Sequence, residues 1–202
     1  MKYAEGDRYE GEWLAGMKYG KGLIKYINGN RFEGEWKDDD INGYGIYSFA
    51  YGDHCEGEWV NGDLNGYGTC KYADGGVYTG NWLNDEKNGE GVMTYDNGDR
   101  YEGSWVNGKR SGQGSYTYVD SGVFEGQWID GDRTGHGIMK YADGGIFIGE
   151  WRKNESSGHG VMTYAGGERY EGNWEKDARN GQGCMTYNNG DRYDGQWLRD
   201  QK

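Results

Sequence analysis

Residues 9–22 read YEGEWLAGMKYGKG, and versions of this stretch recur along the whole chain. The clearest marker is tryptophan, which returns every 23 residues without an insertion: Trp13, Trp36, Trp59, Trp82, Trp105, Trp128, Trp151, Trp174 and Trp197. A fixed period of this length is typical of repeat proteins, in which one supersecondary unit is copied and buries its apolar face against its neighbours. We therefore predict a single repeat array over residues 1–202, with eight complete repeats and partial units at both ends.

Glycine marks positions where side chains are excluded. Counted from the Trp of each repeat, glycine occupies position −2 in every repeat and positions +7 and +9 in every complete one. In the middle of the chain these structural glycines are Gly80, Gly89, Gly91, Gly103, Gly112 and Gly114. Position −4 is Tyr or Phe except at Cys55, and position +13 is always Tyr or Phe. Glycine beside aromatic columns indicates a backbone geometry that larger side chains would block.

Each repeat should form two short antiparallel strands. The alternation in Tyr9-Glu10-Gly11-Glu12-Trp13 has a period of two, and no segment shows the periodicity of a helix. Triplets such as Ile27-Asn28-Gly29 then predict the turn that joins one repeat to the next. Position +3, which is Gly, Asp or Asn, tolerates positive φ and predicts a second turn after each Trp.

The length of the first turn decides the register of the strands. A two-residue loop would scatter the aromatic residues over both faces of the sheet. A three-residue loop, with its last Gly in the left-handed region, sets −4 opposite +11, −2 opposite +9 and Trp opposite +7. We choose the three-residue loop because it gathers all rings on one face, and a slip of one residue would reverse every side chain. Each indole is then expected to lie over glycines of the adjoining strand.

The stretch from Tyr9 to Gly22 resembles the membrane occupation and recognition nexus (MORN) repeat, as do the copies that begin at Cys55 and Tyr101. The resemblance covers nearly the whole chain. The sequence departs from the family pattern at Cys55, Thr79, Ser121 and Ile148. The resemblance implies an elongated, twisted and grooved sheet that serves in scaffolding, dimerisation, docking of partner segments or phospholipid contact. The predicted fold is thus an all-β, single-sheet antiparallel β-meander or solenoid of 23-residue hairpins.

Composition limits the core and the choice of ligand. Hydrophobic residues make up 34% and aromatic residues 16% of the chain, and the net charge is −12. A thin core of rings fits these values better than a thick aliphatic one. The negative charge disfavours nucleic acid and anionic lipid. The polar N-terminal stretch and three cysteines without metal-ligand spacing indicate a cytoplasmic protein, associated with cytoskeleton or membrane only through partners.

Two of the cysteines are expected to be neighbours. Cys55 at −4 and Cys70 at +11 should face each other on the Trp side of adjacent strands, within reach of a disulfide under oxidising conditions. In a reducing compartment we expect these thiols, and that of Cys184, to be free.

None of the motifs that suggest chemistry is complete. The stretch from Asp130 to Gly135 resembles the start of a calcium loop, but Tyr141 stands where the loop needs Glu. His136 and His159 share position +8 without a third metal ligand, and the Gly-x-Gly pairs lack the helix of a nucleotide-binding motif. We therefore predict no enzyme activity, no cofactor and no metal.

The predicted function is a protein–protein interaction scaffold whose aromatic and glycine groove docks a helical or extended partner segment. The residues expected to line the groove are Trp82, Tyr95, Trp105, Tyr118, Trp128 and Tyr141. A basic partner and homodimerisation through open sheet edges are both compatible with the sequence. The alternatives are a phosphoinositide or membrane-surface module, which the net charge disfavours, and a glycan- or choline-binding solenoid.

The face opposite the tryptophans is predicted to be solvated. Pairs such as Glu10 and Glu12 place acids there, while Arg at −5 and Lys at +12 of the facing strand are expected to neutralise them across strands.

Overall fold

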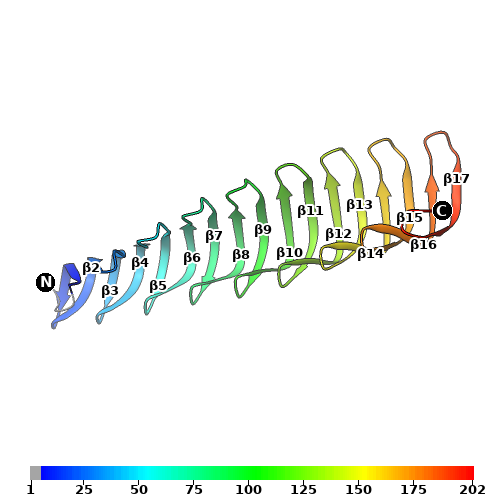
Figure 1. Cartoon of the computed structure of the whole chain (residues 1–202). Coiled ribbons are helices and arrows are strands. Elements are labelled where there is room, and N and C mark those ends of the chain that lie inside the picture. The colour runs from blue at the N-terminus through cyan, green and yellow to red at the C-terminus, as the bar shows by residue number, and fades with distance from the viewer. Residues whose placement is uncertain (1–5) are drawn as a thin grey trace. The chain divides into compact units, whose positions relative to one another are not determined.

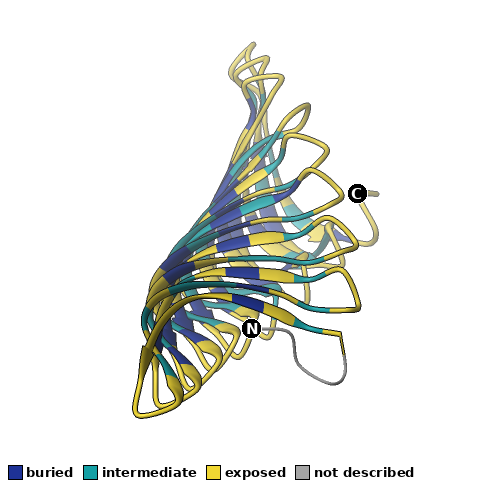
Figure 2. Ribbon diagram, turned by 90° about the vertical axis from the view of Figure 1, so that its left-hand side faces the viewer, coloured by how far each residue is buried: buried dark blue, intermediate teal, exposed yellow. Residues whose placement is uncertain are grey.

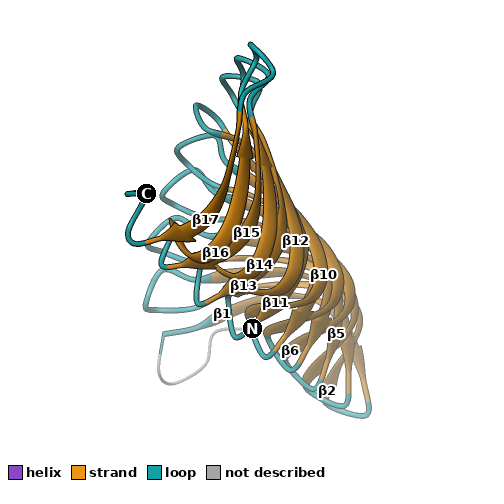
Figure 3. Ribbon diagram, turned by 90° about the vertical axis from the view of Figure 1, so that its right-hand side faces the viewer, coloured by secondary structure: helices purple, strands orange, loops and turns teal. Residues whose placement is uncertain are grey.

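The computed structural model describes residues 6–202. Within this range the fold is all-β, with seventeen strands in one antiparallel sheet and no helix (Figure 3). The chain divides into two compact units. The first comprises Met1–Asp96 and Trp105–Gly108, and the second comprises Asn97–Ser104 and Lys109–Lys202. The division falls within strand β9 (Arg100–Val106). The predicted fold class is confirmed.

The first unit contains β1 (Arg8–Leu14), β2 (Met17–Lys25), β3 (Arg31–Lys37), β4 (Asp40–Ser48), β5 (His54–Val60), β6 (Asp63–Lys71), β7 (Val77–Leu83) and β8 (Glu86–Thr94). The second unit contains β10 (Lys109–Tyr118), β11 (Gly122–Ile129), β12 (Asp132–Tyr141), β13 (Ile146–Arg152), β14 (Glu155–Thr163), β15 (Arg169–Glu175), β16 (Ala178–Thr186) and β17 (Arg192–Trp197). In each unit every strand pairs with the next one along the chain, so hairpins lie side by side (Figure 1).

The predicted register between repeats is confirmed. In the pairing of β2 with β3, Ile24 lies opposite Phe32, Gly22 opposite Gly34 and Gly20 opposite Trp36. The same arrangement returns between β6 and β7 and between β12 and β13. Since the hydrophobic pattern and the turn length both specify this register, each repeat places its rings on the same face.

The turn between repeats has three residues, as predicted. The amide of Tyr26 donates to the carbonyl of Asn30 at 2.9 Å, and Gly29 ends the loop at φ 89°. Where Ser121 takes the place of that glycine, the following Gly122 adopts φ 115° instead. A Cβ on Gly122 would lie 1.9 Å from the carbonyl oxygen of Lys140, so this glycine is required both by its conformation and by its neighbour.

The turn after each Trp requires two residues with positive φ, of which the sequence predicted one. Asn84 at +2 and Asp85 at +3 have φ 49° and 63°, as a type I′ hairpin turn demands. The two-residue turn places Trp82 opposite Lys87 at position +5, and a bulge follows in the strand pair. The glycine at +7 lies in this bulge, and Gly89 has φ 81°.

The core is one side chain deep and consists of alternating rings. Tyr78 at −4 is fully buried and meets two indoles edge to face, Trp82 at 5.0 Å and Trp105 at 5.3 Å between ring centres. The buried residues run as bands along the middle of the strands, and the turns are exposed (Figure 2). Edge-to-face contacts of this kind favour aromatic pairs beyond simple burial.

The ring closest to the glycines is the one at −4, and the indole of the following repeat also reaches the +9 glycine, as predicted for the adjoining strand. A Cβ on Gly137 would lie 2.5 Å from the ring of Phe124 and 3.2 Å from Cδ1 of Trp151. A Cβ on Gly91 would lie 2.2 Å from the hydroxyl oxygen of Tyr78. The −4 ring reaches along the strand over the paired glycines at −2 and +9. The six predicted structural glycines fall into two groups, the crowded Gly80, Gly91, Gly103 and Gly114 and the positive-φ Gly89 and Gly112.

Candidate functional site

The candidate site is the aromatic face, which we define as positions −4, 0, +5, +11 and +13 of each repeat. In the first unit Trp82 and Trp105 are buried, and Tyr95 is half-buried. In the second unit Trp128 is buried, Tyr118 is half-buried, and Tyr141 is exposed. Of the predicted groove residues, therefore, the tryptophans form the core of each unit and the tyrosines at +13 form its accessible outer layer.

The tryptophans are also held by hydrogen bonds that the sequence did not predict. The indole N–H of Trp82 donates to the carbonyl of Gly68 at 3.2 Å. The same bond joins Trp36 to Gly22, Trp59 to Gly45, Trp105 to Gly91, Trp128 to Gly114, Trp174 to Gly160 and Trp197 to Gly183. Each acceptor is the +9 glycine of the preceding repeat, so these indoles fasten one repeat to the next.

Cations at position +5 form a second layer over the rings. The ammonium nitrogen of Lys87 lies 4.9 Å from the ring centre of Tyr72 and 5.2 Å from those of Tyr78 and Trp105. Burial lowers the pKa of Lys87, because the charged form loses solvent there. The corresponding contacts are Lys18 over Trp36 at 4.4 Å, Arg110 over Trp128 at 4.5 Å, Arg133 over Trp151 at 4.4 Å and Arg179 over Trp197 at 4.3 Å.

Sequence reasoning missed this layer although a signal was present. Position +5 is basic in most repeats and apolar or small in three, at Ile41, Leu64 and Ser156. The contact joins a +5 side chain to the Trp of the following repeat, which pairs with position +7 two residues further along the strand. Cation–π contacts of this kind stabilise by about 0.5–2 kcal/mol, depending on how far the cation is desolvated.

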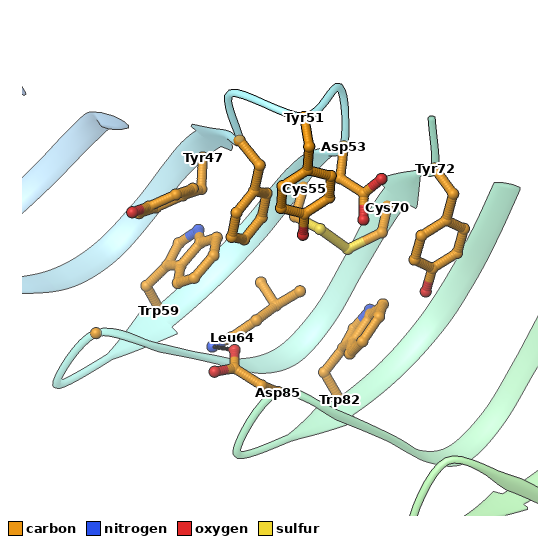
Figure 4. Close-up of a pocket in the computed structure, with 12 residues that line it drawn as sticks. Tyr47, Tyr51, Asp53, Cys55, Trp59, Leu64, Cys70, Tyr72, Trp82 and Asp85 are labelled. Carbon is orange, nitrogen blue, oxygen red and sulfur yellow. Dashed lines mark hydrogen bonds between the residues drawn. A yellow bond between two sulfur atoms is a disulfide. The ribbon is translucent and has the colours of Figure 1, made fainter. Parts of the chain in front are cut away.

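The aromatic face is hollow in the third repeat, the one that contains Trp59, which we call repeat 3. A pocket of about 370 Å³, which we call the repeat-3 hollow, opens between strands β5, β6 and β7 of the first unit (Figure 4). It is lined by Tyr47, Phe49, Tyr51, Asp53, Cys55, Trp59, Gly62, Leu64, Cys70, Tyr72, Trp82 and Asp85. The −4 ring that stands between consecutive indoles in other repeats is replaced here by Cys55. The loss of that ring opens the space.

Cys55 and Cys70 lie opposite each other as predicted, with Cα atoms 4.1 Å apart. They form a disulfide on the floor of the repeat-3 hollow, which confirms that the pair is within disulfide reach, and free thiols in a reducing compartment stay a prediction. Cys184 is free.

Two carboxylates lie at opposite ends of the repeat-3 hollow (Figure 4). Asp53 accepts a hydrogen bond from the amide of Ala73 at 2.8 Å, and Asp85 accepts one from the amide of Leu64 at 2.7 Å. Burial raises the pKa of Asp85, and the nearby carboxylate of Asp63 raises it further. No described Lys or Arg makes an ion pair with either Asp53 or Asp85.

The opposite face carries exposed charges that pair mostly within strands. Arg at −5 contacts the acid at −3 of its own strand in five repeats, in the pairs Arg8–Glu10, Arg31–Glu33, Arg100–Glu102, Arg169–Glu171 and Arg192–Asp194. Lys140 and Glu125, 3.1 Å apart, make the cross-strand contact that was expected throughout. The prediction of general cross-strand neutralisation is therefore wrong, because arginine reaches its second neighbour along the same strand face. Exposed pairs of this kind contribute little stability.

The MORN repeat model matches residues 9–31, 32–54, 55–77, 78–100, 101–123, 124–146, 147–169 and 170–192. The chain belongs to the MORN-repeat family. No curated protein sequence matches it. The MORN chain has the fold of two solved structures of the protein CPAP, despite low sequence identity.

The first of these structures is the TCP10 domain of Danio rerio CPAP in complex with a peptide of Danio rerio STIL, at 12% identity and a TM-score of 0.52. The alignment covers 97% of the MORN chain and 92% of that domain. The second is the G-box domain of the microcephaly protein CPAP, at 11% identity and a TM-score of 0.51 over 98% and 97% of the two chains. At these identities the likeness concerns the fold alone.

In residues 6–202 of the MORN chain no three His, Cys, Asp or Glu side chains are grouped to hold a metal ion. The described residues contain no helix with the length and hydropathy of a membrane span.

Proposed function

We propose that this MORN-repeat protein is a non-enzymatic scaffold that binds a helical or extended segment of a partner protein on its aromatic face. One observation carries the proposal. In residues 6–202 the sheet is a single layer, with no helix or second sheet over the aromatic face, so the half-buried rings at +13 are covered only by their neighbours. A sheet face of this kind normally packs against a further layer, and a partner segment would supply it.

The comparisons support a protein partner. MORN repeats are matched along residues 9–192, and one structure of the same fold contains a bound peptide. Aromatic side chains that are partly exposed on a rigid support also favour binding, because little side-chain entropy is lost when they are covered.

Tyr95 and Tyr118 provide the test. A random-peptide library selected on the full chain should yield binders, and replacement of Tyr95 or Tyr118 by Ala should weaken their binding by about 1–3 kcal/mol. As a comparison on the opposite face, Glu56→Lys with Glu58→Lys should change mainly the salt dependence and the association rate. Circular dichroism of each variant would verify that the sheet is intact.

Two outcomes would reject the proposal. Failure to select any peptide would remove the scaffold function, and loss of binding in the Glu56 and Glu58 variant alone would move the site to the acidic face. Self-association through the edge strands stays a separate prediction, which sedimentation velocity over a range of protein concentrations would test.

A further inference from the structure

The repeat-3 hollow differs from its counterparts by two substitutions on neighbouring strands. At Cys55 the large ring of position −4 is lost, and at Leu64 the cation of position +5 is lost. Leu64 is itself buried at the base of the hollow, between Trp59 and Trp82 (Figure 4). The hollow therefore begins beyond the end of the Leu64 side chain, in the space that the end of a longer +5 side chain would occupy.

Repeat symmetry shows what kind of group this place accepts. One repeat further along, the ammonium group of Lys87 lies over Tyr72, Tyr78 and Trp105. Subtracting 23 from these three positions gives Phe49, Cys55 and Trp82, which all line the repeat-3 hollow. Two of the three rings around the cation are thus retained, while the cation and the third ring are replaced. A cation from outside would meet aromatic faces like those that hold Lys87.

Among residues 6–202, no Lys or Arg makes an ion pair with the carboxylates at the hollow. Asp85 holds the same place relative to Leu64 as Asp200 holds relative to Arg179, since both acids lie 21 residues after the +5 side chain. In the second unit Nε of Arg179 donates to Asp200 at 2.8 Å while its guanidinium group lies over Trp197. In the repeat-3 hollow the carboxylate and the indole of Trp82 are present, and the side chain that would join them is aliphatic.

We propose that the repeat-3 hollow is the anchoring pocket for a lysine or arginine side chain of the partner segment. The cation occupies the space between Phe49, Tyr72 and Trp82 and pairs with Asp85, while Asp53 supplies a second negative charge at the other end. The volume of about 370 Å³ is near the lower limit of small-ligand pockets, which suits one side chain rather than a length of chain. The inference rests on the proposed scaffold function and names the chemistry of its partner.

The pocket can be tested without a known partner. The probes are N-acetyl-arginine amide and N-acetyl-lysine amide, and the neutral control is N-acetyl-norleucine amide. Titration would be followed by NMR through the indole N–H signals of Trp59 and Trp82. We expect saturable shifts from the cationic amides with a Kd of about 1–10 mM, the range open to so small a ligand. An N-acetyl-trimethyllysine amide that binds more tightly than lysine would assign the pocket to methylated lysine.

Asparagine at Asp85 provides a sharp variant. Asn154 occupies the same position in the second unit and accepts the amide of Arg133 at 2.9 Å, so Asp85→Asn can keep the backbone hydrogen bond and lose only the charge. It should weaken the arginine amide about tenfold, as loss of a charged hydrogen bond does. The matched control is Asp177→Asn, because Asp177 also accepts an amide, that of Ser156, but has Phe147 in place of the missing ring. That control should change the Kd by less than about twofold.

A second variant covers the case in which Asp85→Asn fails to fold. Leu64→Arg restores a basic side chain, as in most repeats, at position +5 and should fill the hollow from within. The arginine amide should then no longer shift the indole signals. The inference is overturned if the cationic amides give no saturable shift, if norleucine binds equally well, or if Leu64→Arg leaves binding intact. Peptides that are selected by the aromatic face but keep their affinity in Asp85→Asn and Leu64→Arg would leave the scaffold function standing and reject this pocket alone.

Discussion

At the residue scale, glycine is required in this protein for two different reasons, its backbone conformation and its lack of a side chain beneath a ring. Gly89 is required by a backbone with φ 81°, whereas Gly91 is required by the ring of Tyr78 above it. Repeat 3 allows the effect of the ring to be tested by itself, because Gly68 occupies the position of Gly91 but has Cys55 in place of the ring. A Cβ on Gly68 would find its nearest atom, the carbonyl oxygen of Glu56, at 2.9 Å, against 2.2 Å for Gly91.

We expect Gly91→Ala to destabilise the protein by about 1–3 kcal/mol, the usual cost of overpacking, and Gly68→Ala to cost clearly less. Urea unfolding followed by tryptophan fluorescence would measure both. Equal losses in the two variants would show that the glycine column serves the backbone rather than the ring.

Buried tyrosines give a second prediction at this scale. Burial raises the pKa of Tyr26 and Tyr170 to about 12, from an ordinary 10.0. The unfolded chain ionises first as pH rises, so the stabilisation from these groups is complete below about pH 10 and is lost between about pH 10 and 12. Tyr170→Phe should flatten the fall in urea stability over this range.

The same variant has a predicted effect at neutral pH. The hydroxyl of Tyr170 donates to the carbonyl of Asn173 at 3.0 Å, and its removal should cost about 1 kcal/mol. A pH dependence identical to that of the unchanged protein would contradict the assignment of Tyr170 to the alkaline transition.

At the element scale, the turn after each Trp is the place where sequence and geometry conflict. Its first residue has positive φ in every repeat from Ala15 to Arg199, although Ala, Lys and Arg are poorly suited to that conformation. Asn and Asp tolerate it better, and they occupy the same position in the other repeats. The turns therefore differ in strain while their geometry is the same.

Lys176, at φ 52°, is a clear test of this strain. Lys176→Asn should raise the free energy of unfolding by up to about 1 kcal/mol, because asparagine adopts the left-handed region more easily. The reverse change, Asn84→Lys at φ 49°, should lower it by a similar amount while the backbone hydrogen bond from residue 84 to Asn65 remains. Thermal unfolding of the two variants with opposite signs would confirm the account, and changes of the same sign would contradict it.

At the scale of the whole molecule, contacts join neighbouring repeats and each repeat contributes the same hairpin. Every strand of a unit pairs with its neighbours in the chain, and buried rings at −4 such as Phe124 contact their own indole and the next one. Stability in such arrays is roughly the sum of repeat and interface terms, so whole repeats should be removable.

Deletion of residues 124–146, one repeat of the second unit, should leave a folded protein with a lower free energy of unfolding. Phe147 then follows Val123 as Phe124 did, and the register is kept. Deletion of residues 122–131, which removes β11 and its turn, should disrupt the unit, since β10 and β12 would become parallel neighbours without a crossover connection. Circular dichroism and urea unfolding would compare the two. An unfolded 124–146 deletion would show that stability depends on more than neighbouring repeats.

Much of the fold is determined by the sequence itself. The spacing of Trp, the alternation around it and the Asn-Gly and Asp-Gly turns act over a few residues, so they fix the strands, the register and the face that carries the rings. They also place Cys55 opposite Cys70. Of the candidate site, the sequence predicted Tyr95, Tyr118 and Tyr141, which are at least partly accessible, but it also placed in the groove lining Trp82, Trp105 and Trp128, which the structure buries.

Only the tertiary structure decided which rings cover the glycines, where the +5 cations lie and where the aromatic face is hollow. Each depends on how side chains from neighbouring strands meet: position +7 pairs with the Trp of the following repeat, and the +5 side chain two residues before it contacts that same Trp. A hollow is a property of packing: it exists because Cys55 and Leu64, from two strands, are both too small to fill the space that Tyr78 and Lys87 fill one repeat later. Local pattern specifies directions of side chains, and only their assembly specifies what is left empty.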